Sequence, residues 1–130
     1  MTEARRRISS GGPWETVAGY SRAVVVGDAC WVAGTTDAGP DGVSQHPGDV
    51  AGQARTVFGI IERALTEGGF TLRDVVRTRM FITDMSLSAD LSAVHGEVFG
   101  EVRPAATMVA VAELMEPSLL VEIEVDAVRS

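Results

Sequence analysis

Three acidic residues alternate with apolar residues along residues 119–128, and they are Glu122, Glu124 and Asp126. A period of two places these carboxylates on one face of a β-strand, where they repel one another unless cations lie opposite. Residues 75–83 carry Arg77 and Arg79 at the same spacing. If the two strands are neighbours, charge-assisted ion pairs can form between them. We therefore expect Glu124 and Asp126 to be ion-paired, with direct acid–base chemistry as the open alternative.

Other reactive side chains are few. All eleven basic residues are arginines, which excludes a Schiff base on a lysine side chain. Cys30 is the only cysteine and stands in an apolar run, which is typical of a small core residue rather than a nucleophile. His46 and His95 are far apart in the sequence and form no metal-ligand motif. We expect neither a metal nor a cofactor.

Length and charge limit the class of protein. The chain has 130 residues, and we expect residues 1–130 to form one domain. Its net charge of -7 disfavours nucleic-acid binding, because phosphate contacts require a basic face. The basic cluster at residues 5–7 lies on a terminus that we expect to be mobile. No apolar run reaches the length of a membrane span, and the first residues lack a signal peptide, so we predict a cytoplasmic protein.

The hydrophobic pattern predicts an α+β protein. Strands are expected at residues 20–26, 29–34, 75–83, 107–111 and 119–128, and helices at residues 49–69 and 87–100. Asp49 can cap the first helix, and Gly68-Gly69 ends it. Two helices cover one face of a single sheet, so the other face needs a partner. We therefore predict a closed homo-oligomer.

Short motifs in a fixed order extend over nearly the whole chain. They are Gly19-Tyr20, Val32-Ala33-Gly34, Gln53-Ala54-Arg55, Gly68-Gly69, Asp74-Val75-Val76-Arg77-Thr78, Ile82-Thr83-Asp84, Arg103-Pro104-Ala105 and Val121-Glu122-Ile123-Glu124. Together they resemble the RidA (YjgF) family of reactive intermediate deaminases, also labelled endoribonuclease L-PSP. The resemblance implies a sandwich like the Bacillus-type chorismate mutase, with one mixed sheet and two helices on one face. It also implies a homotrimer with small-molecule clefts between subunits.

The resemblance further implies which residues line the cleft. In the family, a tyrosine near the first strand and the glycine that ends the second strand line the cleft. The first glutamate of the Glu-Ile-Glu motif handles water. These residues are Tyr20, Gly34 and Glu122 here. Family members with the full site release ammonia from enamines and imines, so we expect Tyr20 and Glu122 to be catalytic.

Three polar groups of the family's site are missing. The arginine that clamps a substrate carboxylate is Ala106, the serine before the glycine is Ala33, and the asparagine of the second helix is Ser92. Loss of a bidentate arginine contact costs about 2–5 kcal/mol of binding. Arg22 shares a strand face with Tyr20 and is a candidate replacement, although an arginine beside a strand start is more often solvated. The expected ligand-binding residues are Gly34, Ala106, Thr107, Arg22 and Ser92.

Two functions follow from these residues and remain open. The first is hydrolysis of a reactive imine or enamine, with Glu122 handling water; the competing interpretation pairs Glu122 with Arg77 or Arg79. The second is a non-catalytic metabolite-binding or regulatory trimer, whose more apolar cleft would suit an uncharged or aromatic ligand. His95 either approaches the cleft or is a solvated histidine of the second helix. A ribonuclease has little support, because the chain is acidic and poor in aromatic residues.

Overall fold

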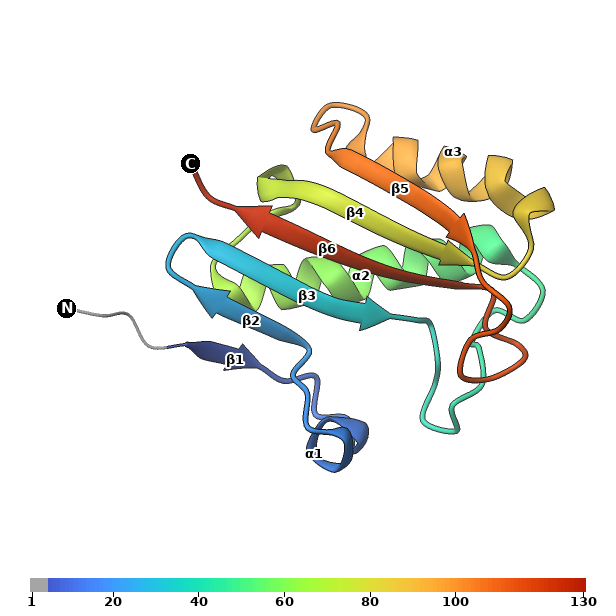
Figure 1. Cartoon of the computed structure of the whole chain (residues 1–130), viewed down its shortest axis with the longest axis horizontal. Helices are drawn as coiled ribbons and strands as arrows, with labels where there is room; N and C mark the ends of the chain where they lie inside the picture. Colours follow the sequence, from blue (N-terminus) through green and yellow to red (C-terminus); the bar gives the residue numbers. More distant parts are fainter. Residues whose placement is uncertain (1–4) are drawn as a thin grey trace.

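The computed structural model describes residues 5–130, and a single mixed sheet forms the front layer of the described part (Figure 1). The strands are β1 (Arg6–Ile8), β2 (Ala23–Val26), β3 (Ala29–Thr35), β4 (Val75–Ile82), β5 (Ala105–Ala110) and β6 (Val121–Val128). Their order is β1-β2-β3-β6-β4-β5. β4 and β5 are parallel, and the other neighbours are antiparallel. The expected pairing of the acidic strand with the arginine strand is confirmed.

Two long helices, α2 (Val50–Gly68) and α3 (Ser88–Phe99), cover one face of this sheet (Figure 1). The Asp49 carboxylate accepts a hydrogen bond from the Gly52 amide at 2.9 Å, and Gly69 ends α2 in the left-handed conformation at φ 87°. Both predicted boundaries of α2 are confirmed. Short helical segments, α1 (Trp14–Ala18), η1 (Leu72–Asp74) and η2 (Met85–Leu87), complete the described elements.

The core lies between α2, α3 and the sheet. Val121, Ile123 and Val125 of β6 are buried, as the period of two predicts, and they meet the apolar stripe of α2. Burial of each such side chain contributes about 1.5–3 kcal/mol. Cys30 is also buried, and burial raises the pKa of its thiol to about 11. The prediction of an inert core cysteine is therefore confirmed.

The first strand and α1 were not expected from the sequence. Arg6 and Arg7 lie in β1, which pairs with β2, so the expectation of a mobile segment is wrong for these residues. The strand is held because Ile8 is buried and because Arg6 donates hydrogen bonds to the carbonyls of Glu67 at 3.3 Å and Gly68 at 3.4 Å. These carbonyls form the C-terminal end of α2, where a cation is favoured.

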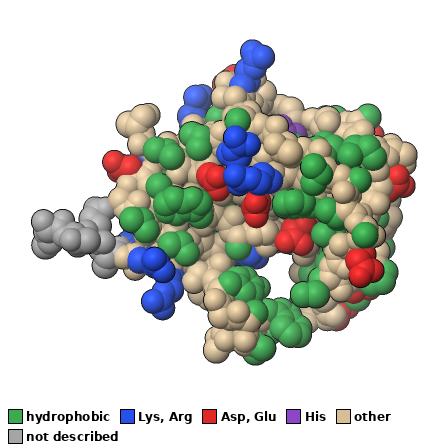
Figure 2. Space-filling model, viewed as in Figure 1, with side chains coloured by type: hydrophobic (Ala, Val, Ile, Leu, Met, Phe, Trp, Pro, Cys, Tyr) green, Lys and Arg blue, Asp and Glu red, His purple; other side chains and the backbone are tan. Residues whose placement is uncertain are grey.

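The face of the sheet opposite the helices is open in this chain. Figure 2 shows hydrophobic patches around a central group of charged side chains, with a hollow between α1 and the loop after β3. Arg79 lies 3.5 Å from Glu124 and 3.3 Å from Asp126, which confirms the predicted ion pairs of these two acids. Partial exposure limits such pairs to about 1 kcal/mol each. None of the helices in residues 5–130 is long and apolar enough to span a bilayer.

Candidate functional site

The close approach of β3 to β6 fixes the position of Glu122. The pairing of the two strands shifts register between Val32 and Thr35, and Gly34 lies within this irregularity. A Cβ added to Gly34 would overlap the Glu122 carboxylate and would stand only 3.1 Å from its Cδ. Gly34 does not have a positive φ. The absence of a Cβ at Gly34 therefore leaves the space in which the glutamate carboxylate packs directly on the backbone.

Arg22 and Tyr20 join these residues on the open face. Arg22 Nη2 donates a hydrogen bond to the Gly34 carbonyl at 2.8 Å, and its guanidinium carbon lies 5.9 Å from the centre of the Tyr20 ring. The Nε of Arg22 is buried and has no hydrogen-bond partner within residues 5–130. The alternative of a solvated Arg22 is thus wrong. We call Tyr20, Arg22, Gly34 and Glu122 the Glu122 cluster.

The Glu122 carboxyl has an electrostatic environment suited to proton transfer. Burial raises its pKa above the ordinary value, the nearby Arg22 guanidinium opposes the rise, and Glu124 adds to it. Within the described chain, Glu122 forms no ion pair with Arg77 or Arg79, so the competing interpretation, in which Glu122 is paired with one of these arginines, is wrong. A half-buried carboxyl with a raised pKa is a stronger base than an exposed glutamate and is better suited to take up a proton and return it.

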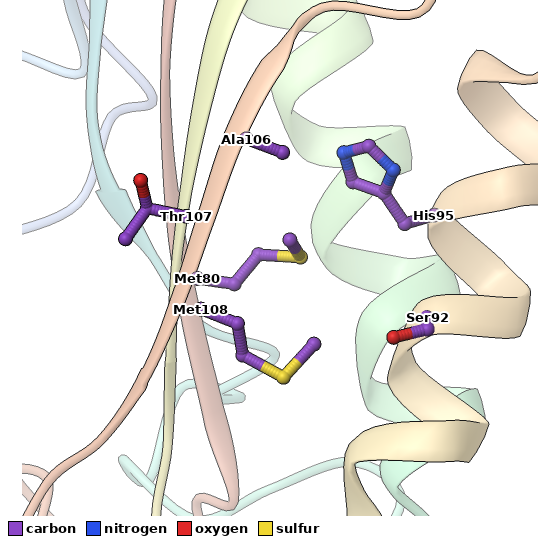
Figure 3. A pocket seen from close by; sticks show the side chains of 6 residues that line it. All are labelled: Met80, Ser92, His95, Ala106, Thr107 and Met108. Carbon is purple, nitrogen blue, oxygen red and sulfur yellow. The ribbon is translucent and has the colours of Figure 1, made fainter.

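Other expected residues gather in a second place, a hollow of about 240 Å³ between α3 and β5. Its lining side chains, drawn in Figure 3, belong to Met80, Ser92, His95, Ala106, Thr107 and Met108. Ala106 and Met108 face α3, because they pair with Thr78 and Met80 on the buried face of β4. Thr107 points away from α3, towards the open face (Figure 3). We call this hollow the α3–β5 pocket.

His95 is more enclosed than expected. Its Nε2 lies 2.9 Å from the Thr78 hydroxyl oxygen, and its ring centre lies 4.9 Å from that of Phe99. Burial lowers the pKa of His95, which favours the neutral form of the ring. The preference for a solvated histidine is therefore wrong. The helical spacing of His95 and Phe99, four residues apart, was the signal in the sequence that this ring packs against the buried side of α3.

The loop after β3 is fixed by buried polar groups that the sequence did not single out. His46 Nδ1 lies 3.3 Å from Asp37 Oδ2, and Asp37 is fully buried. Gln53 of α2 donates hydrogen bonds to the carbonyls of His46 at 3.1 Å and Ser118 at 2.9 Å. It also accepts one from the Leu120 amide at 2.8 Å. The loop is thereby attached both to α2 and to the segment that enters β6.

The two groups of expected site residues are separate in one chain. The Glu122 cluster lies on the open face around β3 and β6, and the pocket lies on the helix side of β5. β4 stands between β6 and β5 in the sheet. The chain therefore brings Tyr20, Arg22 and Gly34 to Glu122, but it does not bring Ala106 or Ser92 there.

Comparison with known proteins gives consistent matches. The family model described as Endoribonuclease L-PSP matches residues 13–129. The Streptomyces coelicolor protein SCO2049 is 39% identical, covering 98% of this chain and 95% of that protein. The crystal structure of Mycobacterium tuberculosis Rv2704, a member of the YjgF/YER057c/UK114 family, is 45% identical and has a TM-score of 0.88, covering 97% of this chain and 100% of that one. The 3-aminoacrylate deaminase RutC of Acinetobacter baylyi is 37% identical over 78 residues, 60% of this chain and 61% of that protein.

Proposed function

The chain belongs to the RidA (YjgF) family, and on this premise we propose that it hydrolyses a reactive imine or enamine of a small metabolite. The observation that carries the proposal is the Glu122 carboxyl, which is half-buried, has a raised pKa and is free of the ion pairs that engage Glu124 and Asp126. A relative named 3-aminoacrylate deaminase supports this class of reaction, because 3-aminoacrylate is an enamine.

In the proposed reaction Glu122 handles water. The enamine takes up a solvent proton on carbon to become an iminium ion, and Glu122 accepts a proton as a water molecule adds to the iminium carbon. Glu122 then returns this proton to the nitrogen of the carbinolamine, the carbon–nitrogen bond breaks and the hydroxyl proton passes to the solvent or to the departing ammonia, so that one iminium ion and one water give one carbonyl compound and one ammonium ion. Tyr20 positions the substrate, and the Arg22 guanidinium favours the ionised form of Glu122, which accepts the proton.

We also propose that the working form is a homotrimer with the cleft between subunits. Support comes from the exposed apolar side chains of the open face, where Trp31 is 47% exposed and Val26 is 42% exposed. Further support comes from the separation of the Glu122 cluster and the α3–β5 pocket within one chain. Contact between copies would bury the exposed apolar side chains and could bring the Glu122 cluster of one copy to the α3–β5 pocket of another.

A second candidate is a binding trimer that does not turn its ligand over. Ala106 favours it, because a methyl group stands where the arginine-bearing relatives carry their carboxylate clamp. In this case Glu122 would bind the ligand without transferring a proton.

The test is ammonia release from imines that an amino-acid oxidase generates in the same solution. We expect wild type to accelerate release and Glu122→Gln, which keeps the shape of the side chain, to lose about 100-fold or more. Asp126→Asn is the matched control, since it removes a carboxylate from the same strand face that, unlike Glu124, is not among the groups that shift the pKa of Glu122, and it should keep the activity. If wild type accelerates no imine, whether anionic or neutral, hydrolysis is refuted and the binding function is favoured. Light scattering on the protein as it elutes from a size-exclusion column measures its molar mass and tests the trimer.

A further inference from the structure

The α3–β5 pocket has the chemistry of a site for uncharged groups. Among residues 5–130, no Arg, Asp or Glu side chain lines it. Its walls are the thioethers of Met80 and Met108 and the methyl group of Ala106 (Figure 3). A carboxylate placed there would lose hydration without gaining a cation, which disfavours its binding. An alkyl or other apolar group would instead gain contact with the polarisable sulfur atoms.

Among the described residues that line the pocket, Ser92 carries a hydroxyl group that is free to bind a ligand. The Nε2 of His95 is occupied by Thr78, which holds the neutral ring as a wall of the pocket. Ser92 lies one turn before His95 on α3, and Figure 3 shows its oxygen directed into the hollow. Within residues 5–130 its hydroxyl takes part in none of the side-chain hydrogen bonds of the structure. A hydroxyl can donate or accept, so it can serve one polar atom of either kind.

We propose that the α3–β5 pocket is a subsite for an uncharged, weakly polar side chain of the ligand. Met80, Met108 and Ala106 contact its carbon atoms, and the Ser92 hydroxyl binds its polar atom. Ala106 determines the specificity, because a longer or charged side chain there would fill the hollow. This inference rests on the proposed function for the reacting half of the ligand. It narrows the substrate class to imines and enamines whose remaining part is neutral.

The test uses two small probes of nearly equal shape, isobutyramide and isobutyrate, which differ in charge at pH 7.5. Carbon-13 methyl spectra of the intact protein report binding at Met80 and Met108, and Met80→Leu and Met108→Leu assign the signals. Met85 and Met115, which are 44% and 95% exposed, serve as internal controls. We expect isobutyramide to shift the Met80 and Met108 signals saturably, and isobutyrate to bind about tenfold more weakly or worse.

Two variants test the individual residues. Ser92→Ala should weaken isobutyramide binding by about 3- to 10-fold, whereas Ser88→Ala, on the same helix outside the pocket, should not change it. Ala106→Arg should reverse the preference in favour of isobutyrate. Equal or tighter binding of isobutyrate to wild type, or no shift of the Met80 and Met108 signals with isobutyramide, overturns the inference. The readout needs no turnover, so a failure of ammonia release and a failure of this subsite are distinguishable.

Discussion

Replacing Gly34 with alanine tests whether the position of Glu122 depends on the absence of a side chain at residue 34. The new Cβ would overlap the Glu122 carboxylate, so the carboxylate must move. Overpacking costs about 1–3 kcal/mol of folding free energy. We expect the lower half of this range at Gly34, because the displaced atoms are the end of a flexible side chain. Alanine also stabilises by about 0.4–1 kcal/mol through the unfolded state, since φ at this position is not positive. The net expectation is a loss of roughly 0–1.5 kcal/mol in the free energy of unfolding.

The decisive assay is a double-mutant cycle in urea. In a Glu122→Ala background the overlap is gone, so Gly34→Ala should become neutral or stabilising, with a coupling of about 1–2 kcal/mol between the two sites. Ammonia release by Gly34→Ala should fall by about 100-fold even where the fold is kept, because a displacement near 1 Å misaligns a catalytic group. An equal cost of Gly34→Ala in both backgrounds would refute the claim that glycine is present to make room for the carboxylate.

Three further changes test other parts of the molecule. Arg129→Ala removes a guanidinium that lies 4.3 Å from the Phe70 ring centre and should lower the free energy of unfolding in urea by about 1–2 kcal/mol. Arg73→Ala is the control, because it removes only an exposed ion pair and should cost less than about 0.5 kcal/mol. Because the pKa of Glu122 is raised in the native state, its carboxyl contributes stability at low pH that is lost as the pH rises through the raised pKa. Glu122→Gln should therefore unfold at higher urea than wild type at neutral pH, and the difference should vanish below the ordinary glutamate range; a lower midpoint at neutral pH contradicts the sign. Gln53→Ala leaves the Ser118 carbonyl and the Leu120 amide, both part-buried, without their side-chain partner, while the His46 carbonyl keeps its bond from the Asp49 amide. The change should cost about 2–4 kcal/mol, and a midpoint like that of wild type would show that water replaces the amide.

The sequence predicted most of the fold because its strands and helices have distinct periods. The alternation in residues 119–128 placed Ile123 in the core and Glu124 on the open face, and Asp49 and Gly69 fixed the ends of α2. The N-terminal strand escaped prediction because it has three residues and only Ile8 is buried. Its support comes from contacts of Arg6 with the distant end of α2, and no local pattern reports such contacts.

The candidate site was predictable only in part. Tyr20, Gly34 and Glu122 were expected from motif resemblance; the structure packs Glu122 on Gly34 and connects Tyr20 to them through Arg22. The position of Arg22 depends on its bond to the Gly34 carbonyl, a contact set by the hairpin and the register shift rather than by sequence spacing. Met80 was not singled out from the sequence, and His95 was weighed only as an alternative to a solvated histidine, because a methionine in a strand and a histidine on a helix have many other uses. These two residues line a common pocket only because α3 packs over β5.

The place of β6 in the sheet has a consequence for synthesis of the protein. β6 follows all the other strands in the chain, yet it lies between β3 and β4 and is paired with both. A nascent chain that has not reached residue 121 holds two separate half-sheets, each with an unpaired edge next to apolar side chains. Ribosomes add about 5–20 residues per second, so these edges stay exposed for seconds before β6 can close the gap. Because β6 also carries Glu122, this carboxyl reaches its position in the Glu122 cluster only when β6 pairs with β3 and β4.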